Sequence, residues 1–265
     1  MPVKPSPVLP APAATLVLLR DRAEGGVETL LVQRHHGSRF AAGDFVFPGG
    51  RVEPADVPDE PETLSAGPSP AEAARILGLA TGATGAFAYW IGAIREAFEE
   101  VGVLLARDGA GRFPATAAPR FVEHRRACQG DHRTFWSMLR AEELRLTTDR
   151  LAYFAHWITP EENPIRFDTR FFVAEMPPGQ DAVADDREII AVRWMSPADA
   201  VAALQRKEIS LRLPTLTNLW MFDGAASAAA AIERVAGRGV TTIRPRLITE
   251  NGVRRALLPG EPGYY

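Results

Sequence analysis

The segment from Arg95 to Val103 constrains this chain more than any other stretch. It reads Arg-Glu-Ala-Phe-Glu-Glu-Val-Gly-Val, so Glu96, Glu99 and Glu100 share one face of a predicted helix. Like charges at this spacing cost about 0.2–0.5 kcal/mol per pair unless something neutralises them. Arg95 offsets part of this repulsion by reaching Glu99. A divalent cation such as Mg²⁺ would offset the rest, because it prefers oxygen ligands. Taken alone, the segment also fits a solvated acidic helix face.

An apolar face accompanies the acidic one. Its residues recur at helical spacing: Phe87, Ile91, Ile94, Phe98 and Val101. Thr84 is the predicted N-cap, and Gly102 is a natural C-terminal stop. The pattern therefore places the three carboxylates on a helix that a large hydrophobic surface fixes to the core.

A second segment, upstream, reads Phe47-Pro48-Gly49-Gly50-Arg51-Val52-Glu53-Pro54-Ala55-Asp56. Paired glycines allow a tight turn and a close approach of the backbone to a ligand. Together the two segments resemble the signature of the Nudix hydrolases, Gly-x5-Glu-x7-Arg-Glu-U-x-Glu-Glu-x-Gly-U, where U is a bulky apolar residue.

The match to that signature is split. Its second half fits from Arg95 onward, with Ala97 as a small occupant of the first U position, and its first half begins at Gly50. Asp56 stands where the family has Glu, and 38 residues rather than 7 separate it from Arg95, an insertion of 31. The insertion leaves the role of Asp56 open.

The resemblance implies the Nudix fold, an α+β architecture in which a mixed β-sheet lies between helices (α/β/α) with helical insertions. We expect one domain over residues 1–265, with a loose arm at 1–13 and the insertion at 57–84. Strands are predicted at 15–20, 27–34, 45–47, 152–158, 170–176 and 189–195, with a final hairpin at 241–249 and 253–258. Helices are predicted at 119–129, 131–144, 196–207, 213–222 and 225–236, and Ser69 with Gly78 bounds a short helix inside the insertion. That insertion is interpreted as a surface excursion, with a lid or dimer element as the alternative.

The same resemblance implies a diphosphatase that uses Mg²⁺ or Mn²⁺. By the family pattern, Glu99 and Glu100 are the leading metal ligands and Glu96 is a third ligand or helper. Arg95 would orient these carboxylates, and Gly50 would offer a backbone carbonyl to the metal. Arg95, Glu96, Glu99 and Glu100 form the predicted catalytic group. The general base remains open, with the acidic segment 185–188 as one candidate and a solvated turn as the other interpretation of it.

Substrate identity depends on residues before the signature. Leu30, Leu31, Arg34, Arg39, Gly43 and the Phe-Pro-Gly-Gly run match the extended motif of Nudix enzymes that hydrolyse coenzyme A. Val32 replaces its Thr, and His35 replaces a small residue. Arg34 and Arg39 are candidates for phosphate binding, because Arg pairs bidentately with phosphate. The alternative interpretation is that one of these arginines ends a strand in solvent and the other pairs with a nearby Asp.

A further likeness covers most of the chain. The split signature, the run 166–172 and the closing Leu257-Leu258-Pro259-Gly260 are similar to one subgroup of coenzyme A diphosphatases. Arg166 and Arg170 become candidate substrate residues. The resemblance implies hydrolysis of coenzyme A or acyl-coenzyme A to 3′,5′-ADP and (acyl-)4′-phosphopantetheine.

Two alternatives stay open. One is a diphosphatase of ADP-ribose, NADH or a nucleotide sugar, although the NADH-type marker Ser-Gln-Pro-Trp-Pro-Phe-Pro is absent after Gly102. The other is a catalytically silent nucleotide-binding domain, which Asp56 and the insertion favour and the intact acidic cluster opposes.

The composition indicates which classes of binding partner to expect. A net charge of −3 and a pI of about 6.0 argue against a nucleic-acid surface built on bulk charge. The chain has one cysteine, Cys128, and no apolar run long enough for a membrane span. We expect a cytoplasmic protein with a small-molecule diphosphate as its partner, no membrane or nucleic-acid partner, and a possible homodimer.

Overall fold

The computed structural model describes residues 8–57, 61–79, 85–250 and 252–264. Its main sheet contains β1 (Ala11–Asp21), β2 (Val27–Arg34), β3 (Phe45–Val46), β4 (Gly49–Arg51), β7 (Ala152–Ile158), β8 (Phe167–Glu175), β9 (Ile189–Met195) and β10 (Thr242–Ile243). The strand order is β10-β7-β8-β1-β2-β3, with β4 also paired to β1 and β9 to β2. β1 runs parallel to β8, and β10 runs parallel to β7, whereas the other pairs are antiparallel. The sheet is therefore mixed, as predicted.

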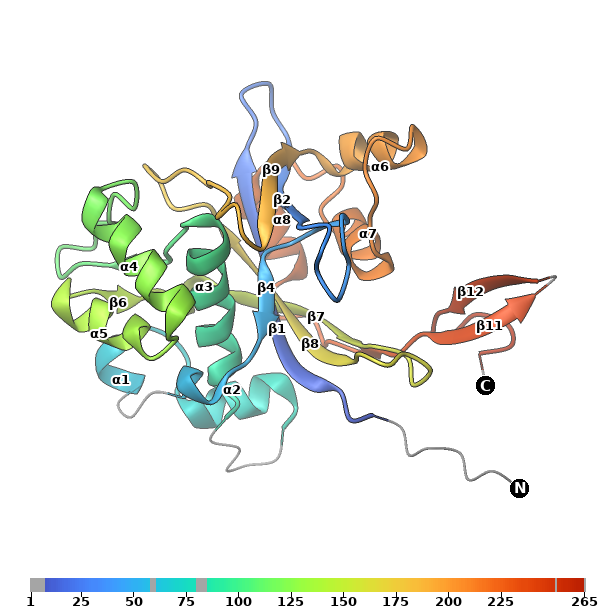
Figure 1. Ribbon diagram of the computed structural model, residues 1–265, viewed down its shortest axis with the longest axis horizontal. Coiled ribbons are helices and arrows are strands. Elements are labelled where there is room, and N and C mark those ends of the chain that lie inside the picture. The colour runs from blue at the N-terminus through green and yellow to red at the C-terminus, as the bar shows by residue number, and fades with distance from the viewer. Residues whose placement is uncertain (1–7, 58–60, 80–84, 251, 265) are drawn as a thin grey trace.

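Helices cover both faces of this sheet (Figure 1). α3 (Ala88–Val101), α4 (Pro119–Gly130) and α5 (Thr134–Ala141) lie on one side, and α6 (Pro197–Gln205), α7 (Leu213–Trp220) and α8 (Ala228–Val235) lie on the other. The alternation of β1 explains why both faces are apolar: Leu16 and Leu18 pack in the cluster around α3, and Val17 and Leu19 pack in the opposite cluster. The α/β/α arrangement expected from the sequence is confirmed.

Most elements lie where the residue patterns predict them. β2, β7 and β9 have the predicted bounds, and the predicted helices around α4 to α8 differ by a few residues at their ends. The apolar stripe of α3 is buried along its length, and Gly102 ends the helix in the left-handed conformation at φ 72°. Thr84, the predicted cap, lies outside the described residues, and α3 begins only at Ala88.

Two local predictions need correction. The arm expected over residues 1–13 is too long, because β1 already begins at Ala11, whose N–H donates to Arg166 O at 2.9 Å. Pro12 does not interrupt the strand, since its carbonyl accepts the N–H of Val52 at 3.0 Å. Residues 1–7 lie outside the described part. The tight turn expected at Gly49 is instead the start of β4, which pairs with β1.

The insertion is more tightly packed than the predicted surface excursion. It contains α1 (Pro61–Leu64) and α2 (Pro70–Leu77), the second capped by Ser69 and ended by Gly78 as predicted. Ala73, Ala74 and Leu77 are buried in the core cluster around α3. Since these apolar side chains lose solvent contact against the core, the insertion is an integral part of this layer.

The remaining elements are short. The 3-10 helices are η1 (Pro54–Asp56) and η2 (Thr148–Arg150), and β5 (Ala106–Arg107) pairs with β6 (Arg145–Leu146). The predicted final hairpin is confirmed as β11 (Arg246–Glu250) with β12 (Val253–Leu257), but its expected first strand is divided because Thr242–Ile243 joins the main sheet as β10. Figure 1 shows this hairpin extending away from the sheet. No described helix has the length and hydropathy of a membrane span.

Candidate active site

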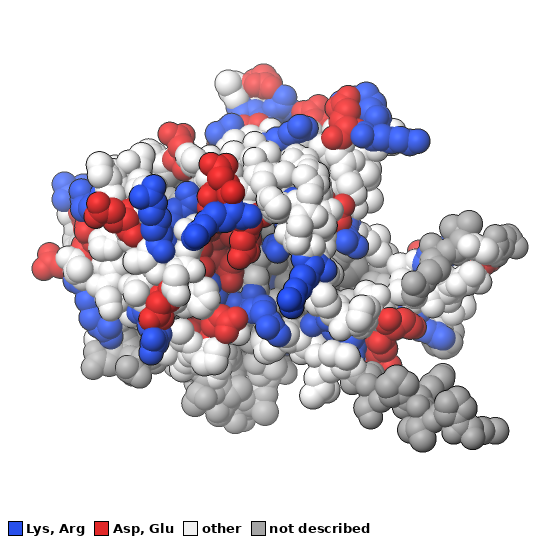
Figure 2. All heavy atoms as spheres, viewed as in Figure 1, with Lys and Arg blue, Asp and Glu red and all other residues white. Residues whose placement is uncertain are grey.

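α3 lies beside β4, at the centre of the view in Figure 1. Glu96 and Glu100 of α3 contact the backbone of this strand. Burial of the apolar face fixes the rotation of the helix, so its acidic residues point toward the Gly49-Gly50 backbone. Acidic side chains gather on this part of the surface, with basic ones around them (Figure 2). The carboxylates are therefore held by a rigid element rather than by a loop.

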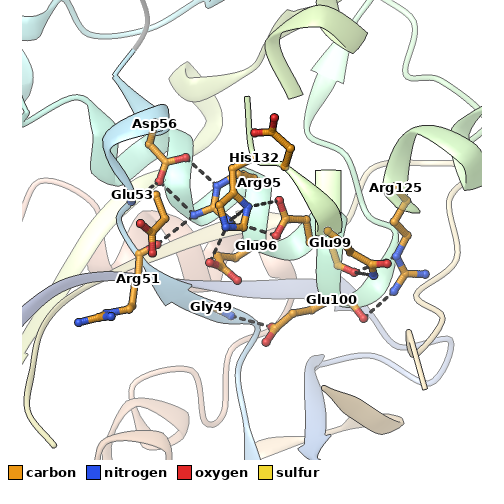
Figure 3. A network of polar contacts seen from close by, with 12 residues as sticks. Gly49, Arg51, Glu53, Asp56, Arg95, Glu96, Glu99, Glu100, Arg125 and His132 are labelled. Atoms are coloured by element: carbon orange, nitrogen blue, oxygen red, sulfur yellow. Dashed lines mark hydrogen bonds and ion pairs between the residues drawn. The ribbon is translucent and has the colours of Figure 1, made fainter. Parts of the chain in front are cut away.

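Arg95 is the centre of the cluster (Figure 3). Its Nη1 donates to Glu96 Oε1 at 2.9 Å and to Glu99 Oε2 at 3.2 Å. Its Nη2 donates to the carbonyl of Arg51 at 2.9 Å. Because the side chain is 1% exposed, these bonds operate in a poorly hydrated environment where they are strong. Arg95 fixes the orientation of both carboxylates.

Asp56 joins this cluster across the insertion. Arg95 donates to it twice, from Nε to Oδ1 at 2.7 Å and from Nη2 to Oδ2 at 3.0 Å. The N–H of Glu53 also donates to Asp56 Oδ2 at 2.8 Å, which fixes the carboxylate at the end of η1. A Cβ on Gly92 would lie 3.0 Å from Oδ2, so the close approach of Asp56 depends on a glycine in α3. The role that the sequence left open for Asp56 is thus a buried ion pair with Arg95.

Glu100 is held by different groups. Its Oε2 accepts the N–H of Gly49 at 3.0 Å, and its Oε1 lies 3.6 Å from Arg34 Nη1. Glu96 packs directly beneath Gly50, where an added Cβ would lie 2.6 Å from the carboxylate. The glycine at position 50 therefore allows Glu96 to approach the backbone of β4, and the N–H of Gly49 holds Glu100.

Replacement of Gly50 by alanine is expected to lower activity, whereas replacement of Gly49 is expected to lower stability. In Gly50→Ala the new Cβ displaces the flexible end of Glu96, and we expect turnover to fall about 10²-fold with the fold retained. In Gly49→Ala the Cβ would lie 2.5 Å from the carbonyl oxygen of Ala14, so stability should fall by about 1–3 kcal/mol. Chemical denaturation and initial rates test both, with Gly130→Ala as the control because its Cβ has open space.

Burial raises the pKa of all three glutamates. Desolvation is the main cause in each, and it raises the pKa of Glu96 to about 7 despite the nearby charge of Arg95. Burial also raises the pKa of Glu99, against the lowering effects of Arg95 and His132. In Glu100, burial and the charge of Glu96 raise the pKa well above its ordinary value. Burial therefore disfavours the ionised form of each carboxylate, and the nearby arginines offset this only in part.

This donor set fits a hard divalent cation by its chemistry. Carboxylate oxygens are the ligands that Mg²⁺ and Mn²⁺ prefer, and a dication would stabilise the ionised forms that burial disfavours. In the described residues, however, the acidic side chains do not converge on one point as a preformed metal cage. Glu96 and Glu99 turn one oxygen each toward Arg95, which leaves their second oxygens for a cation, that of Glu99 also being in contact with His132.

Comparisons with known proteins give the family. The model of the NUDT19 Nudix domain matches residues 8–221. This chain belongs to that family.

Its relatives are of modest similarity. The acyl-coenzyme A diphosphatase NUDT19 of Gallus gallus is 31% identical over 230 residues, which are 72% of this chain and 60% of that protein. The protein of the same name from Homo sapiens is 29% identical over 275 residues, 90% of this chain and 72% of that one. This chain thus spans less than two thirds of the chicken protein. The crystal structure of a Nudix hydrolase from Alicyclobacillus acidocaldarius superposes with a TM-score of 0.73 at 27% identity, covering 88% of this chain and 99% of that chain.

One of the four predicted substrate arginines, Arg34, contacts the carboxylate cluster. Arg34 is next to Glu100 and also donates to the carbonyl of Phe40 at 3.2 Å. Arg39 is exposed on the following loop and forms no hydrogen bond or ion pair with any described residue. The loop itself is fixed by the edge-to-face contact of Phe40 with Phe167 at 5.1 Å. Arg39 is therefore a free cation on an ordered loop.

The other two arginines are not brought to the cluster. Arg166 donates to the backbone carbonyls of Thr159 and Val8 and is 5% exposed. Arg170 is 4% exposed and pairs with Asp168 and His156. Because their guanidinium groups already have partners within the chain, a substrate role for either stays a prediction that these contacts do not favour.

Three residues near the site carried no motif signal. His132, between α4 and α5, places Nδ1 3.0 Å from Glu99 Oε1. Arg125 donates to the carbonyls of Glu99 and Glu100 at 2.9 and 2.7 Å, and Gln129 donates to the carbonyl of Glu99 at 2.8 Å. The bonds of Arg125 and Gln129 satisfy carbonyls at the C-terminal end of α3 that the helix leaves unpaired. Only the i, i+4 spacing of Arg125 and Gln129 on α4 hinted at a shared face.

Proposed function

We propose that this chain is a Mg²⁺- or Mn²⁺-dependent Nudix diphosphatase that hydrolyses coenzyme A or acyl-coenzyme A. The products would be 3′,5′-ADP and (acyl-)4′-phosphopantetheine. The observation that carries the proposal is the buried cluster of Glu96, Glu99 and Glu100 around Arg95, against the Gly49-Gly50 backbone. The names of the NUDT19 relatives and the resemblance of residues 30–50 to the coenzyme A motif support the substrate class.

In this proposal Glu96, Glu99, Glu100 and the carbonyl of Gly50 hold the cation. The bound cation supplies neutralisation of the diphosphate and a lower pKa for an attacking water. Arg95 acts as a positioning residue, because its buried bonds to Glu96 and Glu99 leave it no open side toward a substrate. Asp56 fixes Arg95 in turn.

Arginines at the rim supply the anion contacts. Arg34 lies beside Glu100, where it would bind the diphosphate, and exposed Arg39 would bind a second phosphate such as the 3′-phosphate of coenzyme A. An Arg contact to phosphate is a charge-assisted and frequently bidentate interaction, so each contributes both affinity and orientation. Homodimer formation and a cytoplasmic location stay predictions from the sequence.

Replacing His132 by alanine is expected to weaken Mn²⁺ binding by about 10-fold. Its ring contacts Glu99 Oε1, so its loss leaves that carboxylate less well oriented. Titration of the protein with Mn²⁺, followed by electron paramagnetic resonance, measures this without any substrate. His124→Ala is the matched control, because His124 pairs with Glu142 instead. Equal Mn²⁺ affinity in parent and His132→Ala would contradict the role of His132.

Product analysis tests the function. The purified protein is incubated with coenzyme A, acetyl-coenzyme A, ADP-ribose and NADH, with Mg²⁺ and separately with Mn²⁺, and the nucleotide products are identified by mass. Formation of 3′,5′-ADP from the coenzyme A substrates is the expected result. Dominant AMP from ADP-ribose or NADH would retain the diphosphatase and replace the substrate. Binding without turnover of any compound would favour a nucleotide sensor.

A further inference from the structure

A second concave site lies away from the carboxylate cluster and shares no lining residue with it. It is a surface pocket of about 600 Å³ formed by β5, the loop after it, η2 and the end of β8. Its lining residues are Arg107, Gly111, Arg112, Phe113, Arg150, Glu175, Met176, Pro177 and Pro178. Figure 1 shows β6, the partner of β5, on the far side of α3 from β4. The volume is that of a pocket for a small molecule rather than a polymer.

Positive charge dominates this pocket although the whole chain has a net charge of −3. Three of the lining residues are arginines and one, Glu175, is acidic. Arg112 is neutralised by Asp108, with Nη2 2.8 Å from Oδ2. Among the described residues, Arg107 and Arg150 have no ion pair with an acid. Two guanidinium groups without an ion-pair partner thus line one pocket, which contains a single acid.

The aromatic ring of Phe113 organises these two cations. The guanidinium carbon of Arg107 lies 4.7 Å from the ring centroid, and that of Arg150 lies 5.9 Å from it. Such stacking limits the rotamers of both arginines before any ligand arrives, which lowers the entropic cost of binding. The Nε of Arg107 is buried and has no hydrogen-bond partner among the described residues. The Arg107 guanidinium therefore has hydrogen-bonding capacity that the described chain does not use.

The walls of the pocket are fixed. The side chain of Asp108 accepts the N–H groups of Ala110 and Arg112, both at 2.9 Å, which closes the loop after β5. Gln180, which is 7% exposed, bonds both backbone groups of Leu104 and also donates to the carbonyl of Pro114 at 3.2 Å. It therefore joins the segment after β8 to the loop that carries Phe113.

We infer that this pocket is a second anion site that binds the phosphate of a small phosphomonoester. Arg107 and Arg150 donate to the phosphate oxygens, because planar guanidinium groups match a tetrahedral oxyanion in bidentate geometry. Met176, Pro177 and Pro178 provide an apolar wall for the organic part of the ligand. The site is independent of the diphosphatase function proposed above.

Binding of orthophosphate and phenyl phosphate tests this inference. Isothermal titration calorimetry is run on the full chain in EDTA at constant ionic strength, so that no metal in the carboxylate cluster captures the anion. The parent is expected to bind one equivalent, with phenyl phosphate tighter than orthophosphate. In Arg107→Gln/Arg150→Gln the Kd should rise about 10-fold or more, since two charge-assisted contacts are lost.

The Glu175→Gln variant is expected to change ligand affinity in the opposite direction, and this effect does not depend on the packing of Phe113. Removal of the acid in the lining is expected to tighten binding about 3-fold, because its repulsion of the anion is lost. Arg206→Gln is the control, since Arg206 pairs with Glu208 on the surface. Circular dichroism of each variant without ligand confirms that the fold is intact.

Three outcomes would overturn the inference. These are no saturable binding to the parent at millimolar concentration, equal affinity in the Arg107/Arg150 double variant, or weaker binding in Glu175→Gln. Arg34→Gln distinguishes the two sites, because Arg34 lies beside Glu100. If Arg34→Gln abolishes binding and the double variant does not, the anion occupies the carboxylate site and the second site does not exist.

Discussion

Replacing Glu99 by glutamine is expected to lower kcat by about 10³-fold, the equivalent of roughly 4 kcal/mol of transition-state stabilisation. Glutamine preserves the shape of the side chain and its packing on α3 but removes the anionic oxygens that the proposed cation needs. Rates of 3′,5′-ADP formation at saturating coenzyme A and Mg²⁺ measure the effect. An unchanged kcat would show that Glu99 holds no essential cation.

The stability of the same variant separates lost chemistry from lost structure. Burial raises the pKa of Glu99, which means that its ionised form opposes folding. The metal-free Glu99→Gln protein should therefore unfold at the same or a higher denaturant concentration than the metal-free parent. Glu142→Gln is the matched control, because Glu142 pairs with Arg120 and His124 and not with the cluster. Loss of both activity and stability in Glu99→Gln would make its kinetics uninformative about a metal.

Replacing Arg95 by methionine is expected to lower the free energy of unfolding by about 3–5 kcal/mol. Methionine retains the length and apolar stem, but Asp56, Glu96 and Glu99 lose the cation that they share in a buried site. Urea denaturation of the metal-free protein at pH 8 measures the loss. A second Asp56→Asn substitution should restore part of it, because one uncompensated charge is then removed. A loss below about 1 kcal/mol would mean that the cluster is hydrated.

The pH dependence of Arg95→Met follows from the direction of the carboxylate pKa shifts. In the parent, burial already raises the pKa of Glu96 to about 7. Loss of the Arg95 charge raises it further, so the folded state binds more protons than the unfolded state above the ordinary glutamate pKa. Stability must then fall as the pH rises through that window. We expect Arg95→Met to approach the stability of the parent near pH 5 and to differ most at pH 8, which denaturation at both pH values tests.

The local elements were predictable because hydrophobic periodicity reports burial along a single element. The stripe of Phe98 and its neighbours predicted α3 and its orientation, and thereby the common face of Glu96, Glu99 and Glu100. The β-rich runs 27–34 and 152–158 gave the bounds of β2 and β7, which are largely buried. The family resemblance added the catalytic interpretation, which composition and spacing alone left open between a metal site and a solvated acidic face.

The partners of those residues were decided only by the tertiary structure. Asp56 reaches Arg95 because η1 ends beside Gly92, and no local pattern predicts a contact across the insertion. His132 meets Glu99 only through the packing of α4 and α5 against α3. Arg170, which looked available in the sequence, is captured by Asp168 on its own strand and His156 on the adjacent one.

The sequence by itself thus determined which residues form each helix and strand and which side chains share a face. Only the tertiary structure decided which charges neutralise one another and which remain free, as Arg39 and Arg107 do among the described residues. The physical reason is range. Burial periodicity is a property of neighbouring residues, whereas the pairing of a charged group depends on whatever distant side chain or carbonyl the packed fold brings within about 3 Å of it.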